Sequence, residues 1–285
     1  MKLMEITGLP GSGKSTLTPM VRRAFLRRRL RLLTAEDLVN GYDLAEGRLL
    51  SLLHRLGLPE ALKRRVRARL FRARDVGAGL RDAFVRDEPG LAGVVRRAGR
   101  GQDLSEAERE HLLEVVLRQF GLYRMAESLL TAEDYFLFDE GLAHRAVALF
   151  VSSDRPVEAG PIREYVDRLP AIEMVFHLDM NEALAFERMI RRGLPPRYES
   201  QPLEAVQQRM PPDRWERVRQ RGLIARLKGK DEKTALVFLK RSREAIRLVL
   251  ARLEDKGTLV VHLSNRDHPL TTEAELNRYL KAVLP

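Results

Sequence analysis

The chain has 285 residues, of which 44% are hydrophobic, so it can bury a sizeable core as one domain with insertions or as two small domains. It contains no cysteine, which excludes disulfides, thiolate metal sites and thiol catalysis. No apolar run approaches the roughly 18 residues that a membrane-spanning helix needs, and no cleavable signal pattern is present, so we expect a soluble, cytoplasmic protein with no membrane partner.

The charge is unbalanced, with 51 lysines and arginines against 40 acids and a formal net charge of +11. The basic residues concentrate in segments 22–31, 63–74 and 214–230. Such an excess is compatible with a nucleic acid, an anionic surface or a phosphorylated ligand. In segment 63–74, apolar residues recur at helical spacing among the arginines, as on a solvated helix face. Aromatic residues for base stacking are few, so a nucleic-acid partner is not favoured.

The stretch LMEITGLPGSGKSTL, residues 3–17, contains a phosphate-loop pattern. It opens with a short apolar run that predicts a buried strand. Gly8 then leads through four residues to Gly13, Lys14 and Ser15, which completes G-x-x-x-x-G-K-[ST]. Glycines let the backbone turn its N–H groups toward phosphate oxygens, and a helix beginning near Lys14 adds the positive end of its dipole.

The expected phosphoryl donor is therefore a nucleoside triphosphate, ATP. Lys14 is expected to bridge the β- and γ-phosphates, and the Ser15 hydroxyl to reach Mg²⁺. The predicted nucleotide-binding residues of this loop are Gly8, Pro10, Gly11, Ser12, Gly13, Lys14, Ser15 and Thr16. Neither the N-K-x-D motif of GTPases nor the L-S-G-G-Q motif of transporter ATPases is present. The chain resembles the small P-loop kinases of nucleosides, nucleotides and metabolites, of the thymidylate-kinase-like type.

Residues 29–34, RLRLLT, predict a second strand, and Glu36 and Asp37 follow near its carboxyl end. Ligands of open α/β sheets bind at that end of the strands. Deoxynucleoside kinases, which the chain resembles here, place an acid after this strand to take the proton of the acceptor hydroxyl. The alternative is a capping box, with Thr34 as N-cap and Asp37 three residues later. Both interpretations stay open.

Residues 40–130 read as one helix after another, with no strand signal. In one of these helices Ser105 is a predicted N-cap, with Glu108 three residues on. Segment 86–104, which contains Pro89 and several glycines, is expected to be a mobile loop. The resemblance implies that this helical insertion between the second and third strands forms the acceptor site.

Residues 134–141, DYFLFDEG, predict a third strand that ends in two acids, Asp139 and Glu140. The strand beside a phosphate loop ends in an acid that orders Mg²⁺, and Asp139 is expected to do so. In the kinases that the chain resembles, an arginine usually follows this acid and contacts the acceptor. Glu140 stands there instead, and a carboxylate is suited to accept a hydroxyl proton. Alternatively, both acids cap the next helix, in which His144 is expected to pack and Arg145 is a candidate for the missing clamp.

A helix predicted at 180–193, closed by Gly193 at C′, carries Arg188, Arg191 and Arg192 on one face. In nucleotide kinases a similar helix and loop form a lid whose arginines stabilise the transferring phosphoryl group. The resemblance thus assigns Arg188 and Arg192 to nucleotide binding and catalysis, in a lid-like segment at residues 188–215. Ordinary pairing of basic side chains with the helix dipole is the alternative.

The remaining elements complete the sheet. Residues 172–179 and 258–265 predict the fourth and fifth strands, and residues 202–255 between them read as helical. A last helix is expected to begin with a capping box formed by Thr272 and Glu275.

We therefore expect a single α/β domain, residues 1–285, with a five-stranded parallel sheet of the P-loop kinase type, helices on both faces and a large helical insertion. The expected reaction is ATP- and Mg²⁺-dependent transfer of the γ-phosphoryl group to a hydroxyl of a nucleoside, nucleotide or sugar-like acceptor. The alternatives are a nucleoside monophosphate kinase, a tRNA or polynucleotide kinase, and a non-catalytic nucleotide-binding module. The sequence is compatible with a homodimer. The resemblance covers residues 1–38, 132–195 and 257–285, and leaves out the insertion.

Overall fold

The computed structural model describes residues 1–38, 76–102, 104–198, 201–265 and 269–284. The first part of the expected helical insertion, with the basic segment 63–74, lies outside the described residues. Among the helices that are described, none has the length and apolar character needed to cross a lipid bilayer.

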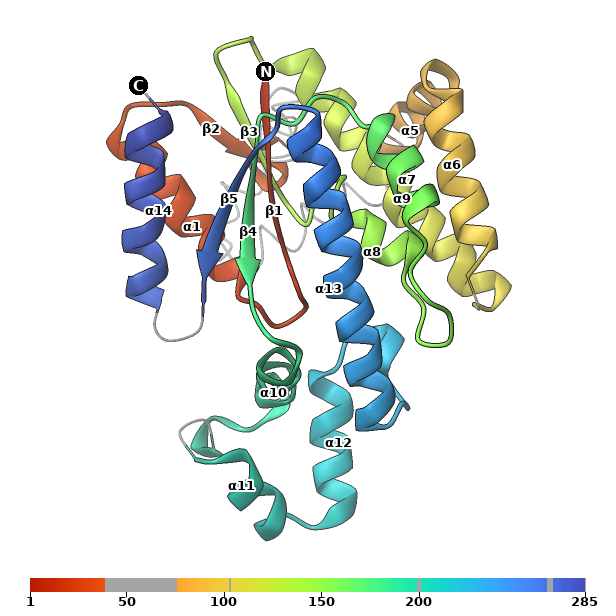
Figure 1. The fold of residues 1–285 in the computed structure, drawn as a ribbon, viewed down its shortest axis with the longest axis vertical. Coiled ribbons are helices and arrows are strands. Elements are labelled where there is room, and N and C mark those ends of the chain that lie inside the picture. The colour runs from red at the N-terminus through yellow and green to blue at the C-terminus, as the bar shows by residue number, and fades with distance from the viewer. Residues whose placement is uncertain (39–75, 103, 199–200, 266–268, 285) are drawn as a thin grey trace, which may run out of the picture.

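A five-stranded parallel sheet forms the centre of the fold, as predicted (Figure 1). The strands lie in the order β2-β3-β1-β4-β5 and comprise β1 (Lys2–Gly8), β2 (Leu32–Thr34), β3 (Tyr135–Asp139), β4 (Met174–Asp179) and β5 (Leu259–Ser264). Strand β1 pairs with both β3 and β4. In the register of β1 with β3, Ile6 lies beside Asp139, so the loop after β1 leaves the sheet next to the acid that ends β3.

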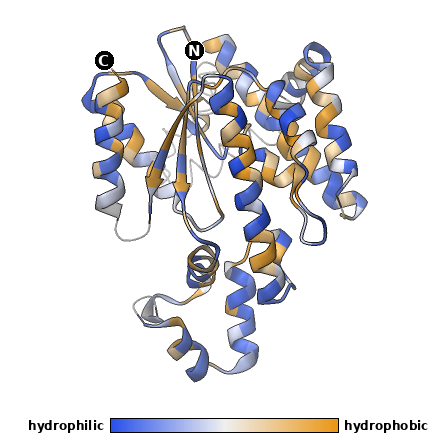
Figure 2. Cartoon of the chain, in the orientation of Figure 1, coloured by the Kyte–Doolittle hydropathy of each residue, from blue (hydrophilic) through white to orange (hydrophobic). Residues whose placement is uncertain are grey.

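Different helices cover the two faces of the sheet (Figure 1). One face carries α1 (Lys14–Arg27) and α14 (Pro269–Val283), which pack against each other. On the other face α13 (Glu232–Asp255) runs alongside the strands and packs against β5 and β1, with α8 (Arg145–Phe150) and α9 (Ala159–Asp167) packed beside it. Figure 2 shows the strands as largely hydrophobic and the helices as mixed, as expected for a buried parallel sheet under amphipathic helices.

The side chains of β1 alternate between these two faces. Met4 and Ile6 belong to the core cluster that includes α1, whereas Leu3 belongs to the cluster that includes α13. Glu5 and Thr7 share the face of Leu3, and both are buried. Two polar side chains of the central strand therefore point toward the segment that follows β3.

Between β2 and β3, the described residues form the helices α5 (Val76–Asp87), α6 (Pro89–Arg100) and α7 (Glu106–Leu129). The prediction of a loop at 86–104 is wrong, because most of that segment is α6. Pro89 stands at the first turn, where its missing N–H costs nothing, and Leu91, Val94 and Val95 form a buried stripe. The predicted N-cap of α7 is confirmed, because the Ser105 N–H donates to Glu108 Oε2 at 3.0 Å and the side chain of Ser105 caps the helix in return.

Past the carboxyl end of β4 lie α10 (Glu182–Gly193), η1 (Pro196–Tyr198), α11 (Leu203–Arg209), α12 (Pro212–Gly222) and η2 (Ala225–Leu227) (Figure 1). Gly193 is the last residue of α10 and not its C′ residue. It is glycine for a different reason, because a Cβ there would collide with the carbonyl oxygen of Val218 in α12. Gly222 likewise lies against the carbonyl oxygen of Met189. Helices α10 and α12 are therefore in direct backbone contact.

The predicted capping box at the last helix is also wrong. Helix α14 begins at Pro269, so Thr272 lies inside it. The Thr272 hydroxyl donates to the carbonyl of Ser264 at 2.9 Å, and Glu275 Oε2 accepts the N–H of Ser264 at 3.0 Å. These two side chains anchor α14 to the end of β5.

Candidate active site at the carboxyl ends of the strands

The segment between β1 and α1 folds back on itself at the carboxyl edge of the sheet. Gly11 and Gly13 adopt left-handed φ angles of 88° and 95°. A Cβ on Gly11 would lie 2.5 Å from the carbonyl oxygen of Ala185, and one on Gly13 would collide with the side-chain amide of Asn265. Only glycine fits either position. No side chain caps the start of α1 after Gly13, so its first backbone N–H groups are left for a ligand.

Lys14 is the first residue of α1, and its side chain is 6% exposed. Its Nζ donates to the carbonyl oxygens of Gly8 and Leu9, both at 3.0 Å, and forms an ion pair with Glu140 at 3.1 Å. Burial lowers the pKa of Lys14, although Glu140 and Asp139 favour its charged form. The carboxylate of Glu140 thus occupies one side of the ammonium that the sequence assigns to phosphate binding.

Asp139 and Glu140 meet Lys14 from the end of β3. Glu140 has a φ of 60°, a left-handed conformation uncommon for a residue with a side chain. Burial opposes ionisation of Glu140, but His144, Lys14 and Arg145 outweigh it and lower its pKa to about 2. Burial and the adjacent Glu140 raise the pKa of Asp139. Helix α8 begins only at Arg145, with His144 at its N-cap, so neither acid caps it.

Three buried polar side chains support the segment after β3. The Glu5 carboxylate accepts the N–H of Ala143 at 3.0 Å, and Thr7 Oγ1 lies 2.9 Å from His144 Nδ1. Burial lowers the pKa of His144 to about 3, so this side chain is neutral at pH 7. Its Nε2 lies 3.9 Å from Glu140 Oε1. Glu5 and Thr7 are not among the residues predicted from the sequence, although an acid inside an apolar strand is a signal that indicates Glu5.

Of the two acids after β2, Asp37 adopts the predicted capping arrangement with Thr34. The Asp37 carboxylate accepts the N–H and the hydroxyl of Thr34 at 2.9 and 2.8 Å, and it pairs with Arg22 at 3.1 Å. Glu36 is exposed. Neither acid is among the residues that line the cavities beside Lys14.

The three arginines predicted to share one face of α10 have different surroundings. Arg192 lines the cavity beside Lys14. Arg188 donates to the carbonyl of Asn265 at 2.9 Å, in the loop after β5. Arg191 is held by Glu187, with Nη2 at 2.7 Å from the carboxylate. The structure therefore brings Arg192 to the phosphate loop, takes Arg188 to the neighbouring loop, and gives Arg191 a partner on its own helix.

Two cavities flank the phosphate loop. We call the larger one, of about 360 Å³, the phosphate cavity; its polar lining includes Lys14, Ser15, Asp139, Glu140, His144, Arg145, Arg192 and Arg226. The smaller one, of about 240 Å³, lies on the other side of the loop; its lining includes Gly13, Thr16, Leu17, Met20, Arg188, Arg192, Asn265 and Thr272. Loop residues Gly11 and Gly13 line both. A ligand on the loop would have one space on each side of it.

The donor chemistry beside Lys14 fits Mg²⁺. Ser15 and Asp139 line the same cavity and offer a hydroxyl and a carboxylate, the hard oxygen ligands that Mg²⁺ prefers. The described residues contain no group of three or more histidines and acids that could hold a metal ion by itself. A magnesium ion here would therefore need phosphate oxygens and water to complete its shell.

Arg226 is not among the residues predicted from the sequence. It lies in η2, within the basic segment 214–230. It lines the phosphate cavity, and its Nη1 donates to the carbonyl of Val151 at 2.9 Å.

No protein-family model matches the chain, and a search of the curated proteins finds no relative.

Proposed function

We propose that this protein is a P-loop kinase that transfers the γ-phosphoryl group of ATP, with Mg²⁺, to a hydroxyl of a small acceptor such as a nucleoside, a nucleotide or a sugar-like alcohol. One observation carries the proposal. A loop that requires glycine at two left-handed positions ends at the uncapped start of α1, and Lys14, Ser15 and Asp139 line one cavity beside it. Backbone N–H groups, an ammonium and two oxygen ligands are what a magnesium-bound triphosphate requires.

The ion pair between Lys14 and Glu140 suggests how the two residues share the reaction. A phosphate oxygen competes with the Glu140 carboxylate for the Lys14 ammonium, because both are anions. When the triphosphate takes that position, Glu140 loses its strongest partner and gains affinity for a proton. The carboxylate that balances Lys14 without nucleotide is then a base once nucleotide is bound.

In the transfer step the acceptor oxygen forms a bond to the γ-phosphorus while the bond from that phosphorus to the β,γ-bridging oxygen breaks. ADP leaves with the electron pair of that bond, and the hydroxyl proton passes to Glu140. Lys14 and Arg192 line the phosphate cavity, and in the proposed reaction they would stabilise charge on the transferring group. Bound Mg²⁺, held by Ser15 and Asp139, would neutralise phosphate charge.

The variant Lys14→Ala tests the donor site. We expect it to lose phosphoryl transfer, by 10²-fold or more on the order of other lost electrostatic donors, and to bind ATP more weakly. Lys281→Ala, on the exposed side of α14, is the matched control and should behave as the parent. The measurements are calorimetric titration with ATP and Mg²⁺ and transfer from labelled ATP across a metabolite library. Normal turnover in folded Lys14→Ala protein would reject the proposal.

The variant Asp139→Asn tests the metal role. Asparagine keeps the size of the side chain, but it is a poor ligand for Mg²⁺. We expect the rate to fall by about 10²-fold and the magnesium concentration for half-maximal rate to rise, with a melting temperature close to that of the parent. A variant with the rate and magnesium dependence of the parent would assign Asp139 a purely structural role.

The net charge of +11 favours one second candidate, a kinase that acts on a tRNA or another polynucleotide end. Transfer to an RNA oligomer with a rate that falls steeply with salt would support this candidate over a small acceptor. Binding of ATP without transfer to any acceptor would instead indicate a non-catalytic nucleotide-binding module.

A further inference from the structure

A third cavity opens beside the phosphate cavity, and the two share part of their walls. This cavity, of about 510 Å³, has a lining that includes Leu112, Val115, Arg226, Lys228, Lys230 and Phe238. Arg226 and Phe238 also line the phosphate cavity. Its volume is within the range of small-molecule sites. We call it the neighbouring cavity.

Arg226 stands in the shared wall with unused hydrogen-bonding capacity. Its Nη1 donates to Val151, but its Nη2 is buried and has no partner in the described part of the chain. Buried donors are nearly always paired in native proteins, and a guanidinium pairs best with a carboxylate or a phosphate. Arg226 lines both cavities and has an unpaired guanidinium nitrogen, so it is a candidate partner for an anionic ligand.

The remaining charges of the neighbouring cavity leave an excess of cations. Lys228 and Lys230 are exposed on the turn after η2, and within the described residues no ion pair engages either side chain. The two acids of the lining already have partners. Glu108 accepts the N–H and the hydroxyl of Ser105, and Asp154 accepts the hydroxyl of Ser152. Glu108 also lies near enough to Arg226 to interact with it electrostatically. An anionic ligand would therefore meet three cations and two carboxylates, and each of these carboxylates already accepts a hydrogen bond from a serine.

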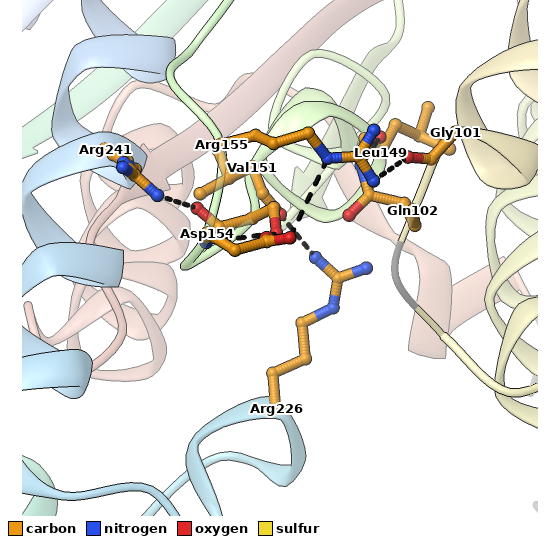
Figure 3. Close-up of polar contacts among 9 residues, drawn as sticks. Gly101, Gln102, Leu149, Val151, Asp154, Arg155, Arg226 and Arg241 are labelled. Atoms are coloured by element: carbon orange, nitrogen blue, oxygen red, sulfur yellow. Dashed lines mark hydrogen bonds and ion pairs between the residues drawn. The ribbon is translucent and has the colours of Figure 1, made fainter.

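Hydrogen bonds in and next to the walls of the neighbouring cavity hold segment 149–155 in place (Figure 3). The carbonyls of Val151 and Ser152 accept from Arg226 and Arg241 at 2.9 and 3.0 Å. On the opposite side, Arg155 donates to the carbonyl of Gly101 at 2.5 Å, and Gln102 donates to the carbonyl of Leu149 at 2.5 Å. Segment 149–155 is thereby bonded both to the turn before α7 and to the region around α13. The site is largely formed before any ligand arrives.

We infer that the neighbouring cavity is the acceptor site, and that the acceptor is a small hydroxylated anion whose carboxylate or phosphate monoester binds Arg226, Lys228 and Lys230. The inference rests on the proposed kinase function, and it narrows the acceptor class. The anionic group of the acceptor binds these cations, and its free hydroxyl is phosphorylated. Because Arg226 and Phe238 belong to both cavities, an acceptor held on Arg226 has the phosphate cavity within reach of its hydroxyl. Phe238, Leu112 and Val115 give the carbon skeleton an apolar contact.

The first experiment compares acceptors in three matched sets, which are neutral polyols, hydroxycarboxylates and phosphate monoesters that carry a free hydroxyl. We expect transfer from ATP to one anionic set and little to the polyols. The better of the two anionic sets shows whether the bound group of the acceptor is a carboxylate or a phosphate monoester. In Lys228→Ala/Lys230→Ala protein the KM of that acceptor should rise by about tenfold or more, as loss of charge-assisted hydrogen bonds implies, while the Kd of ATP stays unchanged. The control Lys240→Ala, an exposed lysine of α13 outside the cavity lining, should match the parent.

A second experiment does not depend on turnover. In Lys14→Ala protein, where the donor site is weakened, inorganic phosphate is titrated by calorimetry with and without the added Arg226→Gln change. We expect millimolar binding that Arg226→Gln removes, with Arg226→Lys retaining part of it. Preference for neutral polyols, or phosphate binding indifferent to Arg226, would overturn the inference while leaving the kinase function in place. Failure to bind ATP or to phosphorylate any acceptor would overturn the proposed function as well.

Discussion

Glu140 has an uncommon backbone conformation and forms an ion pair with the buried Lys14. A φ of 60° costs a residue with a side chain of order 1 kcal/mol or more, and such strain persists where the surrounding structure fixes it. The carboxylate is paired with Lys14 at 3.1 Å, and its pKa of about 2 describes a poor base. Base strength would therefore appear only after a phosphate has replaced the carboxylate at Lys14.

Replacement of Glu140 by glutamine should separate the chemistry from nucleotide binding. We expect Glu140→Gln to lower the transfer rate by about 10²-fold or more, because a general base contributes that much. ATP affinity should change little or rise, because the competing carboxylate is gone. Glu36→Gln is the matched control and should keep the parent rate, since Glu36 lies outside the lining of the phosphate cavity. A slow Glu36→Gln protein beside an active Glu140→Gln protein would move the base to the segment after β2.

Glu5 gives the fold a pH dependence of its own. Burial raises the pKa of Glu5 to about 7. Hydrogen bonds from the backbone N–H groups of Ala143, Leu142 and His144, together with the nearby Arg145, oppose this rise. Tyr165 is the other titratable group beside Glu5. The folded pKa of Glu5 is above the unfolded value of 4.5, so the native state binds the extra proton and loses stability as pH rises from about 4.5 to 7. The full loss is about 3 kcal/mol.

The variant Glu5→Gln removes this titration. We expect its free energy of unfolding, relative to that of the parent, to improve by up to about 3 kcal/mol between pH 4.5 and 7.5. Urea unfolding at several pH values measures this difference. His144 works in the opposite direction, because its pKa is depressed to about 3 and its stabilisation is lost as pH falls below 6.5, but it is common to both proteins. A difference in stability that is independent of pH would mean that Glu5 does not titrate in this range.

The pairing of Lys14 with Glu140 could not be predicted, because it joins residues far apart in the chain through a backbone turn that has no sequence signature. The individual residues were predictable, since a phosphate-loop pattern fixes its spacing and an acid after an apolar run marks the end of a strand. Arg226 was missed for a different reason. Inside a basic segment, one arginine that turns inward has the same sequence context as its solvated neighbours.

At the scale of elements, the contact between α10 and α12 depends on two glycines. A Cβ at Gly193 would collide with the backbone of Val218, and backbone moves less readily than a side chain. We expect Gly193→Ala to destabilise the protein by about 1–3 kcal/mol, as overpacking does. Thermal unfolding measures this loss. Gly160→Ala in α9 is the control, because its Cβ would meet nothing within 4 Å, and it should be neutral or slightly stabilising. Equal effects of the two changes would show that the α10–α12 approach can relax.

The strands were predictable because buried parallel strands appear as short continuous apolar runs between glycines and acids. Helix α6 was not, because Pro89 and the glycines after it were given the weight of loop residues, whereas tertiary packing of Leu91, Val94 and Val95 outweighs that local preference. Thr272 and Glu275 have the spacing of a capping box but bind the end of β5. Spacing alone does not distinguish a bond within a helix from a bond to its neighbour.

For the whole molecule, the net charge of +11 is less concentrated than the sequence suggests. In segment 22–31, Arg23 and Arg27 both pair with Glu273, at 3.3 and 3.6 Å. In segment 214–230, Arg217 pairs with Asp213 and Arg219 with Glu216, each at 2.8 Å. Exposed pairs of this kind contribute little stability, but they neutralise the local field that would attract a polynucleotide.

We therefore expect an RNA oligomer to bind weakly and without sequence preference. Its affinity should be lost between about 50 and 200 mM salt, because only counterion release drives it. Transfer to a small acceptor should vary far less over that range. Filter binding and turnover assays in the same buffers provide the comparison. RNA binding that persists at high salt and competes with the small acceptor would favour the polynucleotide kinase.

Trp215 in α12 is the only tryptophan of the chain, and it packs where the small apolar cluster of Leu194, Val206, Met210 and Val218 meets the larger core on the α13 side. Fluorescence excited near 295 nm thus reports only on the environment of Trp215, at the contact between helices α10–α12 and the rest of the molecule. Circular dichroism, by contrast, averages over every helix. Unfolding curves from the two signals coincide if that junction opens with the sheet, and they separate if it opens first. The protein carries its own fluorescent probe at the place where a lid would move.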